Sequence, residues 1–457
     1  MYQIDFTNPI HIHFIGIGGI SMSGLASILL DQHFQISGSD AKESPLTKWM
    51  EEEGASVSYG QRASNITDGT DLVVYTAAIH PDNPEYTEAV RRNIPLMSRA
   101  ELLGQLMKNY KTPIAVSGTH GKTTVTSMCS HILLAAEKNP TISVGGILKA
   151  IHGNIRVGGH ETFITEACEY TNSFLHFYPK ISLILNIDAD HLDFFKDLDD
   201  IRHSFRLFAE RLPEDGTLII CREIENYEEI THDLPCQVLT YGEGGDYQAR
   251  NISYNSTGYG AFDLVKHGNT IDHFQLSVPG SHNVSNALAA LAMADLLQIP
   301  VDVMQKGLLE FGGTDRRFEK KGEIGGVTII DDYAHHPTEI RATLNAAKNY
   351  PHKTTWCVFQ PHTYTRTKAL MDDFAKALCL ADKVVLADIY AARETNNLGV
   401  NSGMLAEKVR ENGGDACYLP SFDSIENYLL ENCEPGDLLI TMGAGDVVKI
   451  GEHLLGK

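Results

Sequence analysis

A glycine-rich segment, Gly118–Thr124 (GTHGKTT), constrains the fold of this chain more than any other feature. The apolar residues Ile114–Val116 before it predict a strand, and Thr124–Ala136 after it predict a helix. A glycine turn between a strand and a helix presents backbone N–H groups at the positive end of the helix dipole, where anions bind. The segment therefore predicts a phosphate-binding loop for ATP. Its expected contacts are Gly118, Thr119, His120, Gly121, Lys122, Thr123 and Thr124.

Two side chains of this loop carry the phosphate chemistry. Lys122 supplies a cation for the β- and γ-phosphates, and Thr123 supplies a hydroxyl for Mg²⁺. The general phosphate-loop pattern has a glycine where this chain has Val116, so the match is partial. A glycine turn with an incidental lysine is the alternative interpretation.

Strands and helices alternate along the whole chain, which is typical of α/β proteins with parallel sheets. A chain of 457 residues is too long for one hydrophobic core. Strand and helix patterns restart near residues 108 and 315, so we expect three domains, 1–107, 108–314 and 315–457. The predicted strands include Ile12–Ile15, Asp71–Tyr75, Thr162–Thr165, Ile181–Asn186, Val327–Ile330, Thr355–Phe359, Lys383–Ala387 and Asp437–Thr441. The predicted helices include Ser23–Asp31, Ala287–Leu297 and Pro337–Asn349.

The charge balance narrows the possible partners. The chain has 37 basic and 59 acidic side chains, a formal net charge of -22, which disfavours nucleic acids and anionic membranes as partners. No apolar run reaches transmembrane length, and the N-terminus lacks a secretory signal pattern. Eight cysteines are scattered without a CxxC pair, so neither a zinc site nor a disulfide framework is expected. We expect a cytoplasmic protein, either a monomer or a homodimer.

A second glycine cluster lies near the N-terminus, directly after the first predicted strand. Gly16, Ile17, Gly18 and Gly19 begin a G-x-G-x-x-G pattern, but Ser21 occupies the place of the third glycine. Asp40 follows about 20 residues later, where a ribose-binding acid belongs. The pattern predicts a site for a nucleotide or diphosphate, and a plain tight turn remains the alternative.

Acidic residues and a histidine follow two further predicted strands. Glu166 and Glu169 come after one buried strand, and Asp188, Asp190 and His191 follow the next in NIDADH. Ligands of parallel sheets gather at the carboxyl ends of strands, and Mg²⁺ prefers oxygen ligands beside phosphates. We therefore expect a metal site beside the phosphate loop. Solvated loops with capping acids are the alternative.

The last third of the chain places basic and hydrogen-bonding side chains after two successive strands. DDYAHHP begins at Asp331, QPHTYTRT begins at Gln360, and Arg316 precedes both. Helix caps with charged partners would explain such residues singly. Two such groups at neighbouring strand ends instead indicate a binding site. Its candidates are Asp332, Tyr333, His335, His336, His362 and Arg366.

These motifs together resemble the Mur ligase family. The resemblance is carried, in order, by HIHFIGIGGISMSG, GTHGKTT, EACEYTNSF, NIDADHLD, SHNVSNALAA, GTDRRFE, DDYAHHPTEI and FQPHTYTRT, which span residues 11–367. It implies an N-terminal Rossmann-like domain that binds a UDP-sugar and a central P-loop-type ATPase domain with a mainly parallel sheet. It also implies a C-terminal Rossmann-like domain that binds the amino acid and closes over the site.

The resemblance also implies a reaction. ATP phosphorylates the carboxylate of UDP-N-acetylmuramate, and the amino group of L-alanine attacks the acyl phosphate to form an amide in peptidoglycan precursor synthesis. Lys122 would neutralise the transferring phosphoryl group, Thr123 and Glu166 would hold one Mg²⁺, and His191 would hold a second ion.

The remaining site residues follow from the same resemblance. The adenine contacts would be His282, Asn283 and Asn286, while Arg316 and Asp332 would also contact ATP. The UDP-sugar contacts would be Gly16, Ile17, Gly18, Gly19, Ser21, Asp40, Thr76 and Ala77. The amino-acid contacts would be Tyr333, His335, His336, His362 and Arg366, with Arg366 holding the carboxylate in a fork.

The sequence departs from the family pattern at several positions, namely Ser21, Thr76, Cys168, Tyr170 and Thr363. The departures at Ser21, Thr76 and Thr363 put the diphosphate, sugar and amino-acid contacts there in doubt. Three other functions fit part of the pattern. One is a ligase that attaches a recycled tripeptide to the same sugar nucleotide, another is an NAD-dependent dehydrogenase, and the third is a non-catalytic ATP-dependent regulator.

Overall fold

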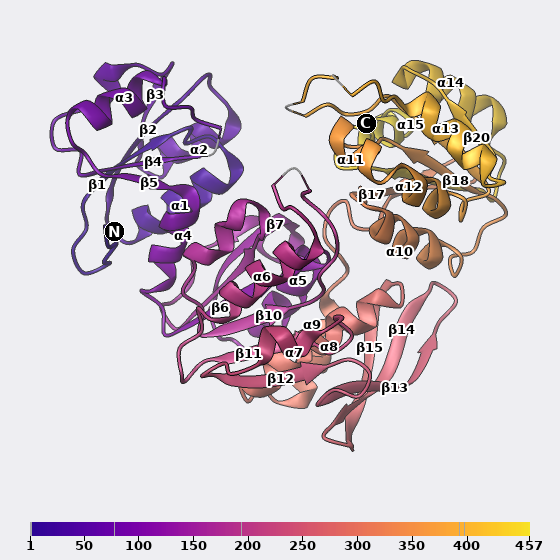
Figure 1. The fold of residues 1–457 in the computed structure, drawn as a ribbon, viewed down its shortest axis with the longest axis horizontal. Coiled ribbons are helices and arrows are strands. Elements are labelled where there is room, and N and C mark those ends of the chain that lie inside the picture. Colours follow the sequence, from indigo (N-terminus) through magenta and orange to yellow (C-terminus); the bar gives the residue numbers. More distant parts are fainter. Residues whose placement is uncertain (1, 77, 193, 393, 397) are drawn as a thin grey trace. The chain divides into compact units, whose positions relative to one another are not determined.

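A computed structural model describes residues 2–76, 78–192, 194–392, 394–396 and 398–457 of the chain (Figure 1). Two compact units divide it. Unit 1 comprises Met1–Ile187, Arg202–Thr240 and Ala292–Ile299, and unit 2 comprises Asp188–Ile201, Tyr241–Leu291 and Pro300–Lys457. Among the described helices, none combines the length and the apolar character needed to cross a membrane.

The N-terminal part of unit 1 is a parallel sheet with the strand order β3-β2-β1-β4-β5. Its strands are β1 His11–Ile15, β2 Gln35–Asp40, β3 Ser56–Tyr59, β4 Leu72–Tyr75 and β5 Leu96–Ser98. Its helices are α1 Ile20–Asp31, α2 Pro45–Glu52, α3 Pro84–Arg91 and α4 Arg99–Met107, with the short 3₁₀ helix η1 Ala63–Asn65. From β1 the chain continues to β2 and β3 on one side, and it later returns to β4 and β5 on the other side of β1. In such sheets a ligand binds at the carboxyl ends of the strands where the strand order reverses, which here is between β1 and β4.

The second sheet of unit 1 has the strand order β12-β11-β10-β6-β9-β7-β8. Its strands are β6 Thr112–Ser117, β7 Thr141–Leu148, β8 Gly153–Arg156, β9 Thr162–Ala167, β10 Ile181–Ile184, β11 Thr217–Cys221 and β12 Gln237–Tyr241. Ser117 pairs with Ala167 on one side and with Ile184 on the other. The loops that follow β6, β9 and β10 therefore leave the sheet at the same edge.

Unit 2 contains an antiparallel ladder, β13-β14-β15, that the sequence did not predict. Its strands are β13 Tyr247–Tyr254, β14 Tyr259–Lys266 and β15 Asn269–Pro279. β14 alternates between buried and partly exposed residues, as expected of an antiparallel strand with one solvated face. The helices between residues 122 and 310, in both units, are α5 Lys122–Ala135, α6 Leu198–Ala209, α7 Tyr227–Thr231, α8 His282–Leu296 and α9 Val301–Glu310, with the 3₁₀ helices η2 Lys149–Ile151 and η3 Tyr170–His176.

The C-terminal sheet of unit 2 has the order β16-β17-β21-β18-β19-β20, and only β16 is antiparallel to its neighbour among the pairs that the structure describes. Its strands are β16 Glu319–Ile324, β17 Val327–Asp332, β18 Thr355–Phe359, β19 Lys383–Leu386, β20 Ala416–Tyr418 and β21 Leu438–Met442. Its helices are α10 Pro337–Ala347, α11 Tyr364–Ala369, α12 Met371–Leu378, α13 Ser402–Glu411, α14 Phe422–Asn432 and α15 Val448–Leu454. Asp332 and Phe359 both lie beside Met442, so the loops after β17 and β18 also share an edge.

The predicted strands and helices are present, with small shifts at their ends. α5 begins at Lys122, two residues before the predicted Thr124, because the loop ends at Gly121, which has a left-handed φ of 83°. α8 begins at His282, five residues before the predicted Ala287. The first residues of α8 include polar side chains, so the apolar pattern does not show where this helix begins.

Candidate functional site

The loop between β6 and α5 depends on two glycines. Gly118 has φ +144°, and a Cβ there would lie 3.0 Å from the Cβ of Leu185, the residue directly after β10. Gly121 has φ +83° and is the N-cap residue directly before α5. Left-handed backbone and close approach to a neighbouring strand both favour glycine. The loop is therefore held tightly against the edge of the sheet, in the position that the sequence predicts for phosphate binding.

Asn186 fixes the loop from the neighbouring strand end. The backbone N–H of His120 donates to Asn186 Oδ1 over 2.8 Å, and Asn186 Nδ2 donates to the carbonyl of His120 over 3.0 Å. The N–H of Thr119 donates to the backbone carbonyl of Asn186 over 3.1 Å. One side chain thus satisfies both backbone groups of His120, so the conformation of the loop does not depend on its own residues alone.

Replacing Asn186 with alanine is expected to weaken ATP binding about 30-fold, because two hydrogen bonds that shape the loop are lost at about 1 kcal/mol each. The dissociation constant of ATP, measured by calorimetry, checks this. Asn251→Ala, which removes an exposed amide that bonds Asp263, is the control and should leave ATP affinity unchanged. Equal affinities for Asn186→Ala and the wild type would contradict the role of this clamp.

Lys122 lies across the loop at the start of α5. Its Nζ donates to the carbonyls of Gly118 and Thr119 and forms an ion pair with Glu169 over 2.9 Å. Burial alone would lower the pKa of Lys122, but the Glu169 carboxylate outweighs it and holds the pKa above the ordinary value. The lysine is therefore a fixed cation at the predicted phosphate loop.

Thr123 and Glu166 lie beside two glycines of β7. The N–H of Gly145 donates to Glu166 Oε1, and a Cβ on Gly145 would lie 2.9 Å from Glu166 Oε2. A Cβ on Gly146 would lie 3.2 Å from the methyl group of Thr123. The missing side chains leave room beside Thr123 and the Glu166 carboxylate, and a threonine hydroxyl and a carboxylate are hard oxygen donors that suit Mg²⁺. These residues fit the predicted metal.

The predicted metal set is divided between the two units. Thr123 and Glu166 belong to unit 1, whereas His191 belongs to unit 2. His191 has φ +54°, and its Nε2 lies 3.9 Å from Asp190 Oδ2. The structure therefore supports a common place for Thr123 and Glu166 only, and the assignment of His191 stays a prediction.

The first glycine cluster forms the predicted turn between β1 and α1. Its N–H groups have internal acceptors: those of Gly16 and Ile17 donate to the carbonyl of Ser39, and that of Gly19 donates to the carbonyl of Gly16. The N–H of Gly18 donates to Asp40 Oδ2 over 2.9 Å. Asp40 thus holds the turn in this structure.

The predicted sugar-side residues after β4 are only partly described. Thr76 Oγ1 accepts from the N–H of Ala78 over 3.2 Å. Ala77 lies outside the described residues. Both sugar-side assignments remain predictions.

Arg366 is the centre of the predicted amino-acid site, in unit 2. Its Nε and Nη2 donate to Asp190 Oδ1 over 3.1 and 2.8 Å, and its Nη1 lies 3.3 Å from His362 Nδ1. Burial alone would raise the pKa of Asp190, but the Arg366 guanidinium holds it well below its usual range. His362 stacks on Tyr390 with ring centroids 5.6 Å apart. The ion pair with Asp190 therefore fixes one edge of the Arg366 guanidinium.

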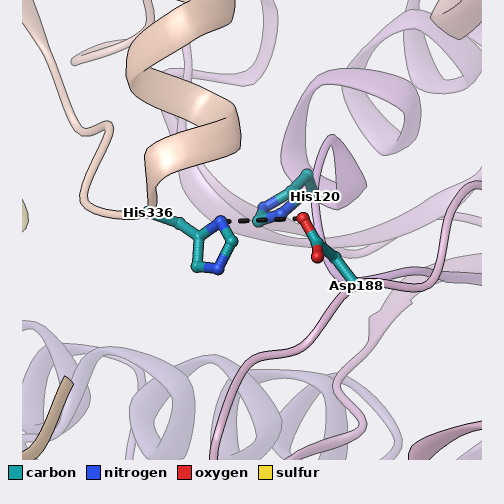
Figure 2. Close-up of side chains that lie close together, drawn as sticks. All are labelled: His120, Asp188 and His336. Carbon is teal, nitrogen blue, oxygen red and sulfur yellow. Dashed lines mark ion pairs between the residues drawn. The ribbon is translucent and has the colours of Figure 1, made fainter. Parts of the chain in front are cut away.

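The loop after β10 also contacts the start of α10, within unit 2. Figure 2 shows the ion pair between Asp188 and His336, in which Asp188 Oδ2 lies 3.7 Å from Nδ1. The hydroxyl of Thr338 donates to Asp188 Oδ2 over 2.6 Å. His336 Nε2 lies 3.2 Å from the carbonyl of Ala189. Buried His336 therefore has a structural role as helix cap and loop contact, whatever else it binds.

His335 lies between Tyr333 and His362, with ring centroids 5.4 and 5.9 Å away. Burial lowers the pKa of His335 to about 4, although the Glu339 carboxylate acts in the opposite direction. The imidazole is therefore neutral near pH 7, and Arg366 is the fixed cation of the cluster.

This shift predicts an acid sensitivity of unit 2. The unfolded state takes up the proton near pH 6.5 and the folded state only near pH 4, so stability falls as the pH drops through that window. The free energy of unfolding should therefore fall between pH 7 and pH 5, and His335→Gln should make this fall smaller by about 2 kcal/mol. Urea unfolding, followed by Trp356 fluorescence in a Trp49→Phe background, measures it. Identical pH profiles for His335→Gln and its parent would contradict the prediction.

Arg316 and Asp332 hold the backbone at the carboxyl edge of the C-terminal sheet. Arg316 pairs with Asp331 over 2.9 Å and donates to the carbonyls of Gly443 and Gly445. Asp332 accepts from the N–H groups of Phe318 and Ala334, and burial raises its pKa to about 6. These contacts give both residues a structural role, and their contacts to ATP stay predictions.

The predicted adenine residues lie at the start of α8. Asn286 Nδ2 donates to Asn283 Oδ1 over 2.9 Å, and Asn283 Nδ2 donates to the carbonyl of Pro279 over 2.7 Å. The two amides are one turn apart and share one face of the helix. His282 is exposed at the first position. The spacing agrees with a pair of amides that read a base edge, and the assignment itself stays a prediction.

Four residues have contacts in these clusters that the sequence did not predict: Glu169, Asp188 and Asp190, which the sequence offered only as possible metal ligands, and Asn186, which had no predicted role. All four lie in the motifs EACE and NIDAD, so their motifs were recognised but their partners were not. An acidic residue in such a motif indicates that a cation lies nearby, but the motif does not indicate which cation pairs with it.

Comparison with known proteins identifies the family. Three family models match successive segments: "Mur ligase family, catalytic domain" at residues 11–111, "Mur ligase middle domain" at residues 116–294, and "Mur ligase, glutamate ligase domain" at residues 316–445. A UDP-N-acetylmuramate–L-alanine ligase of Agathobacter rectalis is 60% identical over 459 residues, covering 100% of both chains. Its counterpart from Lachnospira eligens is 59% identical over 458 residues, again covering 100% of both.

Solved structures agree with this match. The UDP-N-acetylmuramate-alanine ligase MurC of Thermotoga maritima is 30% identical with a TM-score of 0.80, covering 98% of both chains. A murein peptide ligase of Psychrobacter arcticus is 26% identical with a TM-score of 0.69, also covering 98% of both. The α/β fold with an N-terminal, a central and a C-terminal domain is confirmed, while the predicted boundaries at 107 and 314 remain predictions. The chain belongs to the Mur ligase family.

Proposed function

We propose that this chain joins L-alanine to UDP-N-acetylmuramate at the expense of ATP, as a step of peptidoglycan precursor synthesis in the cytoplasm. The observation that carries the proposal is Lys122, a fixed cation in a glycine loop, with Glu166, Glu169 and Thr123 on the same sheet edge. A phosphoryl group that transfers here meets a lysine and oxygen donors, which is what phosphoryl transfer requires. The names of the full-length relatives support the choice of substrates.

The proposed reaction has two chemical steps. A carboxylate oxygen of UDP-N-acetylmuramate attacks the γ-phosphorus of ATP, and the bond to ADP breaks. The amino nitrogen of L-alanine then attacks the acyl carbon, and the carbon–oxygen bond to phosphate breaks. Lys122 would neutralise charge on the transferring group in the first step. Arg366, fixed by Asp190, would hold the carboxylate of L-alanine and so orient its amine for the second.

Mg²⁺ is the metal that suits the oxygen donors beside the loop. Thr123 and Glu166 would hold it, and it would neutralise phosphate charge when bound. Asn283 and Asn286 would bind adenine, and the glycine cluster with Asp40 and Ser21 would bind the UDP part of the sugar nucleotide. The domain assignments 1–107, 108–314 and 315–457 belong to this proposal.

Transfer of oxygen-18 tests the acyl-phosphate route. UDP-N-acetylmuramate labelled at both carboxylate oxygens is incubated with ATP, Mg²⁺, L-alanine and the protein. The proposed route moves one labelled oxygen into inorganic phosphate and leaves the other in the amide. Inorganic phosphate that stays unlabelled while the amide forms would rule out the acyl phosphate.

A further inference from the structure

Arg99 is held rigidly at the start of α4 in unit 1. It follows the helix cap Ser98, which exchanges two hydrogen bonds with Glu101, so the first turn is fixed. Gly104, further along the helix, packs so closely on η3 that a Cβ there would lie 1.9 Å from the carbonyl oxygen of His176. The helix therefore cannot shift without losing this contact, and the position of Arg99 is set by the fold.

The guanidinium of Arg99 has no carboxylate partner among the residues that the structure describes. Its Nη1 donates to the hydroxyl of Ser21 over 3.1 Å, and the thiol of Cys168 is the group that acts on it electrostatically. Its side chain is half-buried, and burial lowers the pKa of Arg99. A cation that gives up hydration without gaining an acid is costly, and the chain has 59 acidic residues that could pair with it.

The two neighbours of Arg99 lie in different predicted sites of unit 1. Ser21 follows the glycine cluster, in the first turn of α1. Cys168 lies between Glu166 and Glu169, next to the phosphate loop. The unpaired cation thus lies between the glycine cluster and the loop that holds Lys122.

The glycine cluster itself offers few donors for an anion. The N–H groups of Gly16, Ile17, Gly18 and Gly19 all have acceptors within the turn or on β2. A diphosphate at this edge needs a donor from elsewhere, and a guanidinium presents paired N–H groups that match phosphate oxygens. Resting on the proposed function, we infer that Arg99 binds the diphosphate of the UDP-sugar, with the Ser21 hydroxyl orienting its guanidinium.

Calorimetric titration of the full chain with two sugar nucleotides tests this inference. UDP-N-acetylmuramate has both the diphosphate and the reacting carboxylate, whereas UDP-N-acetylglucosamine has the diphosphate and lacks that carboxylate. Arg99→Ala is expected to weaken both about 30-fold, in line with the loss of a charge-assisted contact. Arg99→Lys should lose about fivefold, because it keeps the charge without the fork. Ser21→Ala should lose about threefold, as expected for one neutral hydrogen bond.

Arg91→Ala is the matched control, because it removes an exposed arginine of the same domain that pairs with Glu88. It should leave both affinities unchanged, and ATP affinity should be the same in every variant. Unchanged sugar-nucleotide affinity in Arg99→Ala would overturn the inference. A loss confined to UDP-N-acetylmuramate would also overturn it, because the carboxylate would then be the ligand. A parallel loss of ATP affinity or a lower melting temperature in Arg99→Lys would indicate a structural role instead.

The inference and the proposed function fail separately. If the wild type shows no alanine-dependent ADP release but Arg99→Ala still loses UDP-N-acetylglucosamine, only the proposed function fails. If turnover is normal and Arg99→Ala binds both nucleotides like the wild type, only the inference fails.

Discussion

Replacing Lys122 with alanine is expected to lower the kcat of alanine-dependent ADP release by about a thousandfold or more, the scale seen when a cation is removed from a phosphoryl-transfer site. The reason is the place of Nζ, which donates to the carbonyls of Gly118 and Thr119 inside the loop that would surround the phosphates. A coupled assay of ADP release measures it. Wild-type turnover in Lys122→Ala would remove the loop from the mechanism.

The same substitution removes the ion pair between Lys122 and Glu169. Glu169 is 2% exposed, so losing this ion pair of a buried carboxylate is expected to cost about 3 kcal/mol of stability. Lys122→Ala with Glu169→Gln removes both charges and should restore the melting temperature while activity stays absent. If the double variant recovers both stability and turnover, the loss in Lys122→Ala was a folding defect and the catalytic role is wrong.

Replacing Arg366 with alanine is expected to raise the KM for L-alanine about a hundredfold, as expected when a guanidinium–carboxylate pair is lost. The KM for ATP should change less than about twofold, because the affected contact is with the amino acid. Arg366→Lys should lie between, since it keeps the charge without the two-point contact. Initial rates at varied L-alanine and saturating ATP measure the effect.

Lys368→Ala is the matched control for Arg366. Lys368 lies on the same helix, α11, is exposed, and donates to the carbonyl of Leu398. Its substitution should leave both KM values unchanged. Asp190 already occupies the Nε and Nη2 side of Arg366, so a wild-type KM for L-alanine in Arg366→Ala would mean that the guanidinium serves only this internal pair.

The sequence was sufficient to predict the glycine turn between β6 and α5 and the edge of the sheet on which it lies. Gly118 and Gly121 do what the pattern requires, and the parallel register of β6 with β9 places Glu166 at the same edge. Such predictions succeed because they depend on strand direction and local turn geometry, which short motifs encode. The α/β alternation of the flanking domains is equally local.

Partners of the predicted residues could not be read from the sequence. Lys122 pairs with Glu169, and Arg366 pairs with Asp190, over sequence separations that no local pattern reports. The hydrogen bonds between Asn186 and His120 depend on two neighbouring strand ends. An uncharged amide in a sequence does not indicate that it will hold a loop in this way. The antiparallel ladder of β13, β14 and β15 was missed because its exposed residues weaken the apolar pattern of buried strands.

The most direct test of the proposed ligase is ADP release with two alternative amino substrates. The protein is incubated with ATP, Mg²⁺ and UDP-N-acetylmuramate, and either L-alanine or the recycled tripeptide is added. We expect ADP release that depends on L-alanine, together with a product whose mass equals UDP-N-acetylmuramate plus one alanine residue. ADP release only with the tripeptide, or no ADP release with either, would contradict the proposed function.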